Sequence, residues 1–234
     1  MRRKDTHMKP ILFNTEMVKA ILDGRKTATR RVAFPHKNLR KFSRPDNPDA
    51  WWFRGRAYTD WNSAMRSPQG VLSLCKYKQG DVLYVRETWA RLSDWVDVYP
   101  KEGLFDKYVY RADLENDPHL GGWRPSIHMP KEAARIFLRV TDIRVERLQE
   151  MPHDAPKKEG IHYCECPDGF TPNSHTTMQD CYINPMGAMK ALWNSTVKKS
   201  DLETYGWDAN PWVWVIGFER ISREETISEE TTLR

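Results

Sequence analysis

The chain has 234 residues, of which 39% are hydrophobic and 12% aromatic, which is enough to fill a folded core and excludes a disordered chain. Lysine and arginine exceed aspartate and glutamate by 37 to 32, so the net charge of +5 favours polyanionic partners without requiring them. There is no run of 18 apolar residues, and the start MRRKDTHMKP lacks the apolar stretch of a signal peptide. We therefore expect a cytoplasmic protein that has no membrane partner.

The first predicted element is a short amphipathic helix at residues 14–23, NTEMVKAILD. Asn14 or Thr15 can cap its start, and Gly24 can end it. The basic stretch GRKTATRR follows directly at residues 24–31. From the residues alone it suits a solvated surface loop, a clamp for phosphates, or the housing of a lysine and a hydroxyl that do chemistry.

A β-strand is predicted after the turn that follows, because residues 82–89 alternate in the period of two. In this alternation Glu87 shares a face with Leu83, Val85 and Trp89. A carboxylate on an apolar face is either paired with a cation or part of a pocket, and the sequence leaves both open.

The remaining elements are a long strand near residues 134–145, a helical stripe at 186–199 and a final apolar strand at 210–221. No βαβ alternation links them, so we predict an α+β fold, a small mixed or antiparallel β-barrel with flanking helices. We predict one domain at 9–221 and a flexible acidic tail at 222–234. Three long insertions are expected within the domain, at about 33–75, 91–125 and 161–185.

Lys26 and Thr29 in the basic stretch could do chemistry together. A threonine hydroxyl is a poor nucleophile unless a base or a cation activates it. A lysine can be that base where burial and neighbouring cations, here the arginines at positions 25, 30 and 31, lower its pKa. Residues three apart meet in a turn but lie on opposite faces of a regular strand, so the pairing requires that Gly24 be followed by a segment that is not extended.

The pattern Gly24-x-Lys26-x-x-Thr29-x-Arg31 resembles the signature of the ASCH domain, a barrel related to the PUA domains that bind RNA. The flanking phrases FNTEMVKAILDGRKTATRR, YVRETWA and WRPSIHMP are similar to the longer ASCH proteins of phages and prophages, which accounts for the insertions. Three further landmarks of the family follow in order, namely GDVL at 80–83, the pair Glu159-Gly160, and the last strand VWVIGFERI.

The resemblance implies a function, because members similar in the core include N4-acetylcytidine amidohydrolases. Carried over, Thr29 attacks the acyl carbonyl, Lys26 takes its proton, and Glu159 shuttles a proton or holds the lysine in place. The alternatives are a non-catalytic RNA- or DNA-binding module, or a metal-dependent ribonuclease. The expected partner is a nucleoside or a nucleic acid, RNA rather than DNA, and the oligomeric state is left open. The residues expected to contact substrate or nucleic acid are Arg25, Arg31, Glu87, Trp89 and Trp123.

The other tryptophans fall into two groups. Trp212 and Trp214 alternate on one face of the last strand and are predicted to lie in the core. The first insertion holds Trp51, Trp52 and Trp61 beside Arg54 and Arg56, which suits either stacking on bases or packing of the insertion onto the barrel.

The third insertion contains Cys164, Cys166, His175 and Cys181, residue types that bind zinc. Their spacing is not that of a standard zinc finger, so we expect reduced cysteines and no cofactor, with a structural zinc as the alternative.

Overall fold

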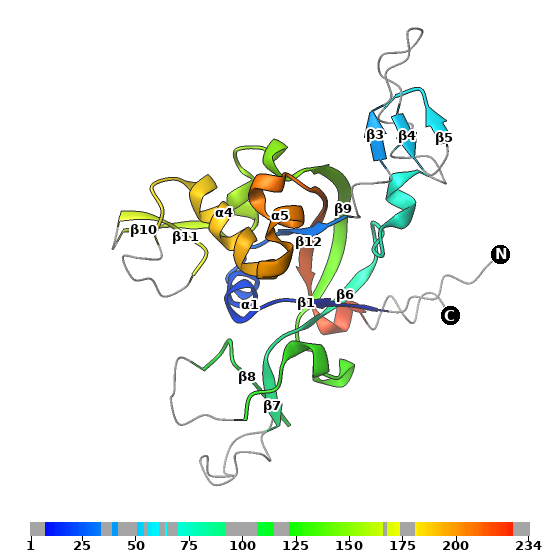
Figure 1. Ribbon diagram of the computed structural model, residues 1–234. Helices are drawn as coiled ribbons and strands as arrows, with labels where there is room; N and C mark the ends of the chain where they lie inside the picture. Colours follow the sequence, from blue (N-terminus) through cyan, green and yellow to red (C-terminus); the bar gives the residue numbers. More distant parts are fainter. Residues whose placement is uncertain are drawn as a thin grey trace, which may run out of the picture.

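A computed structural model describes residues 8–33, 39–41, 51–53, 56–60, 64, 70–91, 107–114, 122–165, 168–173 and 181–226. Its centre is a five-stranded sheet in the order β1-β6-β9-β12-β2 (Figure 1). β1 runs parallel to β6, and the other neighbours are antiparallel. The strands are β1 (Lys9–Leu12), β2 (Ala28–Val32), β6 (Val82–Arg86), β9 (Phe137–Arg147) and β12 (Trp212–Ile221).

The helices and the smaller sheets surround this sheet, so the predicted α+β class is confirmed. In the described ranges no strand pairing joins β1 to β2, the two edges, and the sheet is not closed into a barrel. The α-helices are α1 (Thr15–Leu22), α3 (Ala155–Lys158), α4 (Pro185–Thr196) and α5 (Leu202–Tyr205). Short 3-10 helices are η2 (Val71–Leu74), η4 (Ser126–His128), η5 (Lys131–Ala133), η6 (Leu148–Glu150), η8 (Lys199–Asp201) and η9 (Trp207–Ala209).

Helix α1 forms as its sequence predicts. The Asn14 side chain accepts a hydrogen bond from the Met17 backbone N–H at 2.8 Å, which caps the first turn. Gly24 has a φ of 74°, a left-handed conformation that glycine adopts without strain, and the helix ends just before it. The basic stretch therefore starts at a defined turn.

Strand β12 packs on both of its faces, because its side chains alternate between two hydrophobic clusters. Val213 and Val215 face the cluster to which α4 contributes. Trp214 and Ile216 face the cluster that contains residues of α1, and Trp212 lies there too. The prediction that both tryptophans of this strand belong to the core is confirmed.

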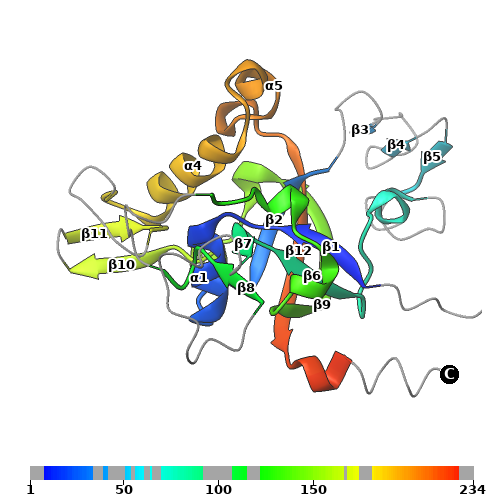
Figure 2. The same ribbon diagram turned by 90° about the horizontal axis from the view of Figure 1, so that it is seen from below.

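The three predicted insertions contain strands of their own. In Figures 1 and 2 the first of these sheets lies on the side of the molecule opposite the third. The sheets are β3 (Leu39–Lys41), β4 (Trp51–Phe53) and β5 (Arg56–Tyr58); β7 (Trp89–Arg91) and β8 (Tyr108–Tyr110); β10 (His162–Glu165) and β11 (Asp168–Thr171).

Some predictions fall on residues that the structure does not describe. Trp51 and Trp52 are described in their backbone only, within β4, and Arg54 and Trp61 lie outside the described residues, as does the tail from residue 227. Within the described part of the chain, no helix has the length and apolar character needed to cross a membrane.

Candidate functional site

The centre of the candidate site is a buried pair between Lys26 and Glu159. The lysine Nζ lies 2.5 Å from Glu159 Oε2 and 3.1 Å from the backbone oxygen of the same residue. Lys26 is 2% exposed and Glu159 4%. A buried pair this close is a high-energy arrangement unless each charge is compensated, so the surroundings decide its protonation.

The pair meets because two turns pack against each other. Glu159 ends α3, with its backbone N–H donating to the Ala155 carbonyl at 3.1 Å. Gly160 follows with a φ of 97°, and a Cβ on it would lie 2.9 Å from the Cβ of Ala20 in α1. The Lys26 backbone N–H donates to the Ala20 carbonyl at 2.9 Å. The glycine thus lets the two turns approach, and the Glu-Gly sequence of the predicted landmark has a physical reason.

A second cation holds the other oxygen of Glu159. Arg30 Nη1 lies 3.1 Å from Glu159 Oε1, while its Nε and Nη2 lie 3.1 and 2.7 Å from Glu146 Oε1. Glu146 also accepts a hydrogen bond from the surface residue Arg144, at 3.2 Å. The sequence analysis did not identify Arg30 or Glu146 as site residues. They lie 116 residues apart on β2 and β9, which each pair with a different edge of β12, and the sequence carries no local signal for this arrangement.

A pocket of about 220 Å³ lies beside this network, and Thr29, Arg31 and Glu159 line it. The Thr29 side chain is almost fully buried. Among the described residues, its hydroxyl group makes no hydrogen bond. The opposite wall is apolar and comes from α1 and α4, with Met17, Met189, Leu192, Trp193 and Val197.

Lys26 lies before β2, in an isolated bridge with Glu159, and Thr29 lies within the strand. The segment that we expected not to be extended is therefore extended at Thr29, and within the described part of the chain the two residues are linked only through Glu159, which binds Lys26 and lines the pocket with Thr29. Burial lowers the pKa of Lys26 below its ordinary value, the Glu159 carboxylate opposes this change, and Arg31 and Arg30 add to it. The lysine therefore loses its proton more readily than an exposed one, which is the property that a general base needs.

The two predicted binding arginines occupy different places. Arg31 lines the pocket, where its Nη2 donates to the Leu12 carbonyl at 2.6 Å and its Cζ lies 5.2 Å from the centre of the Phe13 ring. Arg25 lies outside the pocket lining and donates to Gly160 O at 2.8 Å and to Asp23 at 2.9 Å. It braces the turn that presents Glu159.

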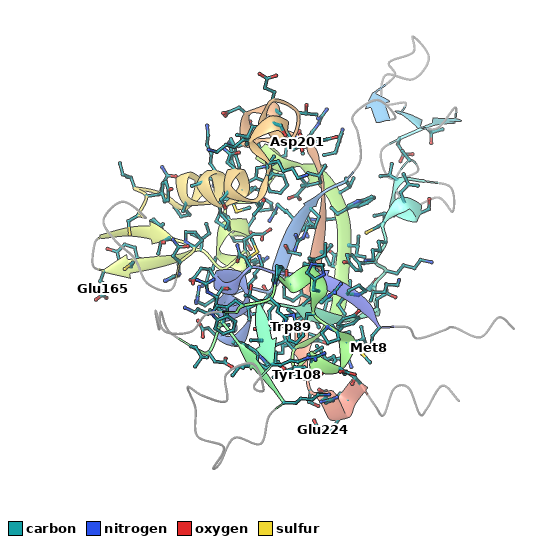
Figure 3. The ribbon with its side chains drawn as sticks, turned by 60° about the horizontal axis from the view of Figure 1, so that its bottom comes forward. Met8, Trp89, Tyr108, Glu165, Asp201 and Glu224 are labelled. Atoms are coloured by element: carbon teal, nitrogen blue, oxygen red, sulfur yellow. The ribbon has the colours of Figure 1, made fainter. Side chains whose placement is uncertain are left out.

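The other predicted binding residues lie away from the pocket lining. Glu87 is bonded by both oxygens to Arg135, at 2.9 and 3.0 Å. Trp89 is buried, with its ring 5.6 Å from that of Tyr108 in an edge contact, and both are labelled in Figure 3. Trp123 packs against a different small cluster. The structure therefore brings Lys26, Thr29, Arg31 and Glu159 together and leaves Glu87 and the two tryptophans in a separate region.

The structure describes two of the four predicted zinc ligands. Within the described residues Cys164 and Cys181 form no disulfide, and Cys166 and His175 lie outside those residues. Over the ranges that are described, no three cysteine, histidine or acidic side chains form a group that could hold a metal ion.

Comparisons with protein-family models, with curated proteins and with solved structures give no match to this chain.

Proposed function

We propose that the protein is an ASCH-domain amidohydrolase that removes the acyl group from an N4-acylated cytidine. The observation that carries this proposal is the buried pair of Lys26 and Glu159 next to a pocket that Thr29 also lines. The order of these residues in the chain matches the family pattern.

In the proposed reaction Thr29 Oγ1 attacks the acyl carbon, and its proton passes through Glu159 to Lys26. Glu159 is the member of the pair that lines the pocket, which supports the relay. The bond between the acyl carbon and the exocyclic nitrogen then breaks, and the leaving amine takes the proton back from the lysine. Water hydrolyses the resulting ester on Thr29, releases the carboxylic acid and restores the hydroxyl.

The size and lining of the pocket support a small substrate. Its volume of about 220 Å³ is below the range of roughly 300–1,000 Å³ typical of sites for drug-sized ligands. This suits a base with its acyl group, with the sugar outside. The Trp193 ring is fixed by a hydrogen bond from Nε1 to the Tyr205 carbonyl at 2.8 Å, so the apolar wall has one rigid flat member.

The test is incubation of the purified chain with a panel of acylated and unmodified nucleosides, followed by mass spectrometry. We expect cytidine and acetate from N4-acetylcytidine, loss of this turnover in Thr29→Val, and partial retention in Thr29→Ser. Thr171→Val is a matched control, because Thr171 is also fully buried but lies outside the pocket. Wild-type protein that leaves every acylated nucleoside intact would refute the proposal.

A second function is favoured by Arg31, whose guanidinium group lies at the pocket. In a non-catalytic module the same group would bind a phosphate or a base carbonyl of RNA. Binding of single-stranded RNA that weakens in Arg31→Gln and persists in Thr29→Val, without turnover of acylated nucleosides, would favour this alternative.

A further inference from the structure

A chain of charged groups runs from the surface into the candidate site. Arg144 on the surface contacts Glu146, Glu146 contacts Arg30, and Arg30 contacts Glu159. Glu159 then contacts Lys26 at the buried end. Every link is a charge-assisted hydrogen bond of 3.2 Å or less. Two strands and the turn after α3 supply these groups, so the chain depends on tertiary structure.

Without the lysine proton, the charges of this cluster balance. Arg30 and Arg31 are two permanent cations, and Glu146 and Glu159 are two carboxylates. At the surface, Arg144 is balanced by Asp142 at 3.1 Å. A protonated Lys26 would add one uncompensated positive charge to a buried site, and such a charge is costly.

We propose that Arg30 and Glu146 are positioning residues for the hydrolysis proposed above, on which this inference rests. Arg30 binds Glu159 Oε1 and so holds the carboxylate with Oε2 directed at the lysine. Glu146 holds the guanidinium group of Arg30 in that position and balances its charge. The proton taken from Thr29 then comes to rest on Lys26 and not on Glu159.

The arrangement of the two carboxylates supports distinct roles. Arg30 presents its Nε and Nη2 to a single oxygen of Glu146, and this fixes the plane of the guanidinium group. Its remaining Nη1 reaches Glu159. A lysine at position 30 would supply the charge without the fork, which makes Arg30→Lys the conservative variant.

The other charged groups near the cluster are largely paired with each other. A second pocket of about 330 Å³, which Arg30 also lines, contains Lys158 and Asp154, which lie 2.7 Å apart. On α1, Lys19 pairs with Glu16 at 3.4 Å. Three sets of charged and titratable groups face the cluster. Lys26 is surrounded by Glu159, Arg30 and Arg31, and Tyr77 lies near Arg31. Arg30 is faced by Glu146 and Glu159, and in the second pocket by Asp142, Arg144, Asp154 and Lys158.

The test measures the protonation of Lys26 directly, by NMR of the ¹⁵N-labelled lysine side chain as a function of pH, without substrate. Arg30→Gln removes a cation, so Lys26 should bind its proton about tenfold more tightly. Glu146→Gln removes an anion and frees Arg30 to bind both oxygens of Glu159, so Lys26 should bind its proton more weakly. Arg30→Lys should leave the equilibrium near that of the wild type.

Opposite shifts from the two variants are the decisive result. A purely structural role would admit water in either variant, and both would move Lys26 toward the behaviour of an exposed lysine. Shifts in the same direction, or no shift, would overturn the inference. Arg139→Gln and Glu219→Gln are the controls, since that ion pair also joins two strands of the central sheet, β9 and β12, at 3.0 Å, and they should leave Lys26 unchanged.

The inference and the proposed function fail in different ways. If the opposite shifts occur but no acylated nucleoside is hydrolysed, the charge network stands and the hydrolase proposal falls. If hydrolysis occurs, the pH profile of kcat/KM should move with the Lys26 protonation equilibrium in each variant. If the pH profile of kcat/KM is the same in both variants as in the wild type, Arg30 and Glu146 are not positioning residues for the hydrolysis.

Discussion

Glu159 and Glu87 are both almost completely buried, and each accepts hydrogen bonds from an arginine, but their other contacts differ. Glu159 binds Arg30 with one oxygen and Lys26 with the other. Glu87 uses both oxygens for Arg135, whose remaining donor group reaches Asp113 at 2.5 Å. The first carboxylate therefore has a lysine partner, whose pKa burial lowers, and the second has an arginine partner that stays protonated.

The two regions also change the pKa of their cations in opposite directions. Burial lowers the pKa of Lys26 more than Glu159 raises it. Burial also acts to lower the pKa of Arg135, but hydrogen bonds to Glu87 and Asp113 outweigh it and raise the pKa above its ordinary value. A cation whose pKa is raised stays charged and keeps its ion pair, while a cation whose pKa is lowered provides a site for proton transfer.

The two carboxylates also differ in whether they lie at a pocket. Glu159 lines a pocket together with Thr29. Glu87 lies beneath Arg135, whose Cζ is 4.0 Å from the centre of the Tyr110 ring. Burial of a carboxylate thus does not distinguish a structural residue from a functional one. The titrating partner and the adjacent pocket make that distinction.

The largest expected effect is the loss of hydrolysis in Lys26→Met. Removal of a general base typically lowers a rate by about 10²–10⁴-fold, and we expect that loss in kcat for N4-acetylcytidine. Arg135→Gln is the counterpart in the other region, and its kcat per folded molecule should equal that of the wild type. Equal losses in both variants would mean that the two carboxylates do not differ in function.

The second effect concerns stability, where we expect Arg135→Gln to be more damaging than Lys26→Met. Arg135→Gln leaves Glu87 buried without its cation, which should lower the free energy of unfolding by about 3–5 kcal/mol. Lys26→Met leaves Glu159 bound to Arg30 in a cluster whose charges balance, so the loss should stay below about 2 kcal/mol. Urea unfolding followed by tryptophan fluorescence measures both. A larger loss in Lys26→Met would contradict the charge balance.

The local elements of the fold could be predicted because their signals are local. The cap of Asn14, the stop at Gly24 and the alternation of β12 lie within a few residues of the structure they specify. Strand β9 begins at Phe137, three residues later than the predicted start. A 3-10 helix ends at Ala133, and residues 134–136 connect it to the strand.

The site was less predictable, because its contacts are distant in sequence. Lys26 and Glu159 are 133 residues apart, and only the family pattern pointed to their pairing. From the apolar face of its strand, Glu87 was correctly recognised as either paired or in a pocket. The sequence could not choose between these, because Arg135 lies 48 residues away on another segment. Strand alternation also gives no indication that Arg30 reaches Glu159.

A third effect is the pH dependence of stability, which should separate the two regions. The pKa of Lys26 in the folded state lies below its ordinary value of 10.5, so between these two values the unfolded chain holds more protons than the folded one. The free energy of unfolding of the wild type, relative to Lys26→Met, should therefore rise with pH across that window. Urea unfolding at intervals between about pH 7 and pH 10 measures it.

The control for this dependence is Arg135→Gln, for which the same difference should stay flat, because arginine remains protonated throughout. If the wild type instead lost stability relative to Lys26→Met as the pH rose, the folded state would bind the lysine proton more tightly than the unfolded one. Lys26 would then be a locked cation, like Arg135.

The smallest effects are expected at the outer ends of the two networks. Asp113 and Arg144 are each close to half exposed, and ion pairs at such positions contribute about 0.2–1 kcal/mol. Asp113→Asn and Arg144→Gln should each lower the free energy of unfolding by no more than that, and added salt should reduce the difference further. Losses of several kcal/mol in either variant would mean that the exposed ends hold the buried pairs in place. Losses within the expected range would mean that Glu159 and Glu87 differ because of their buried partners, Lys26 and Arg135, and not because of the exposed ends.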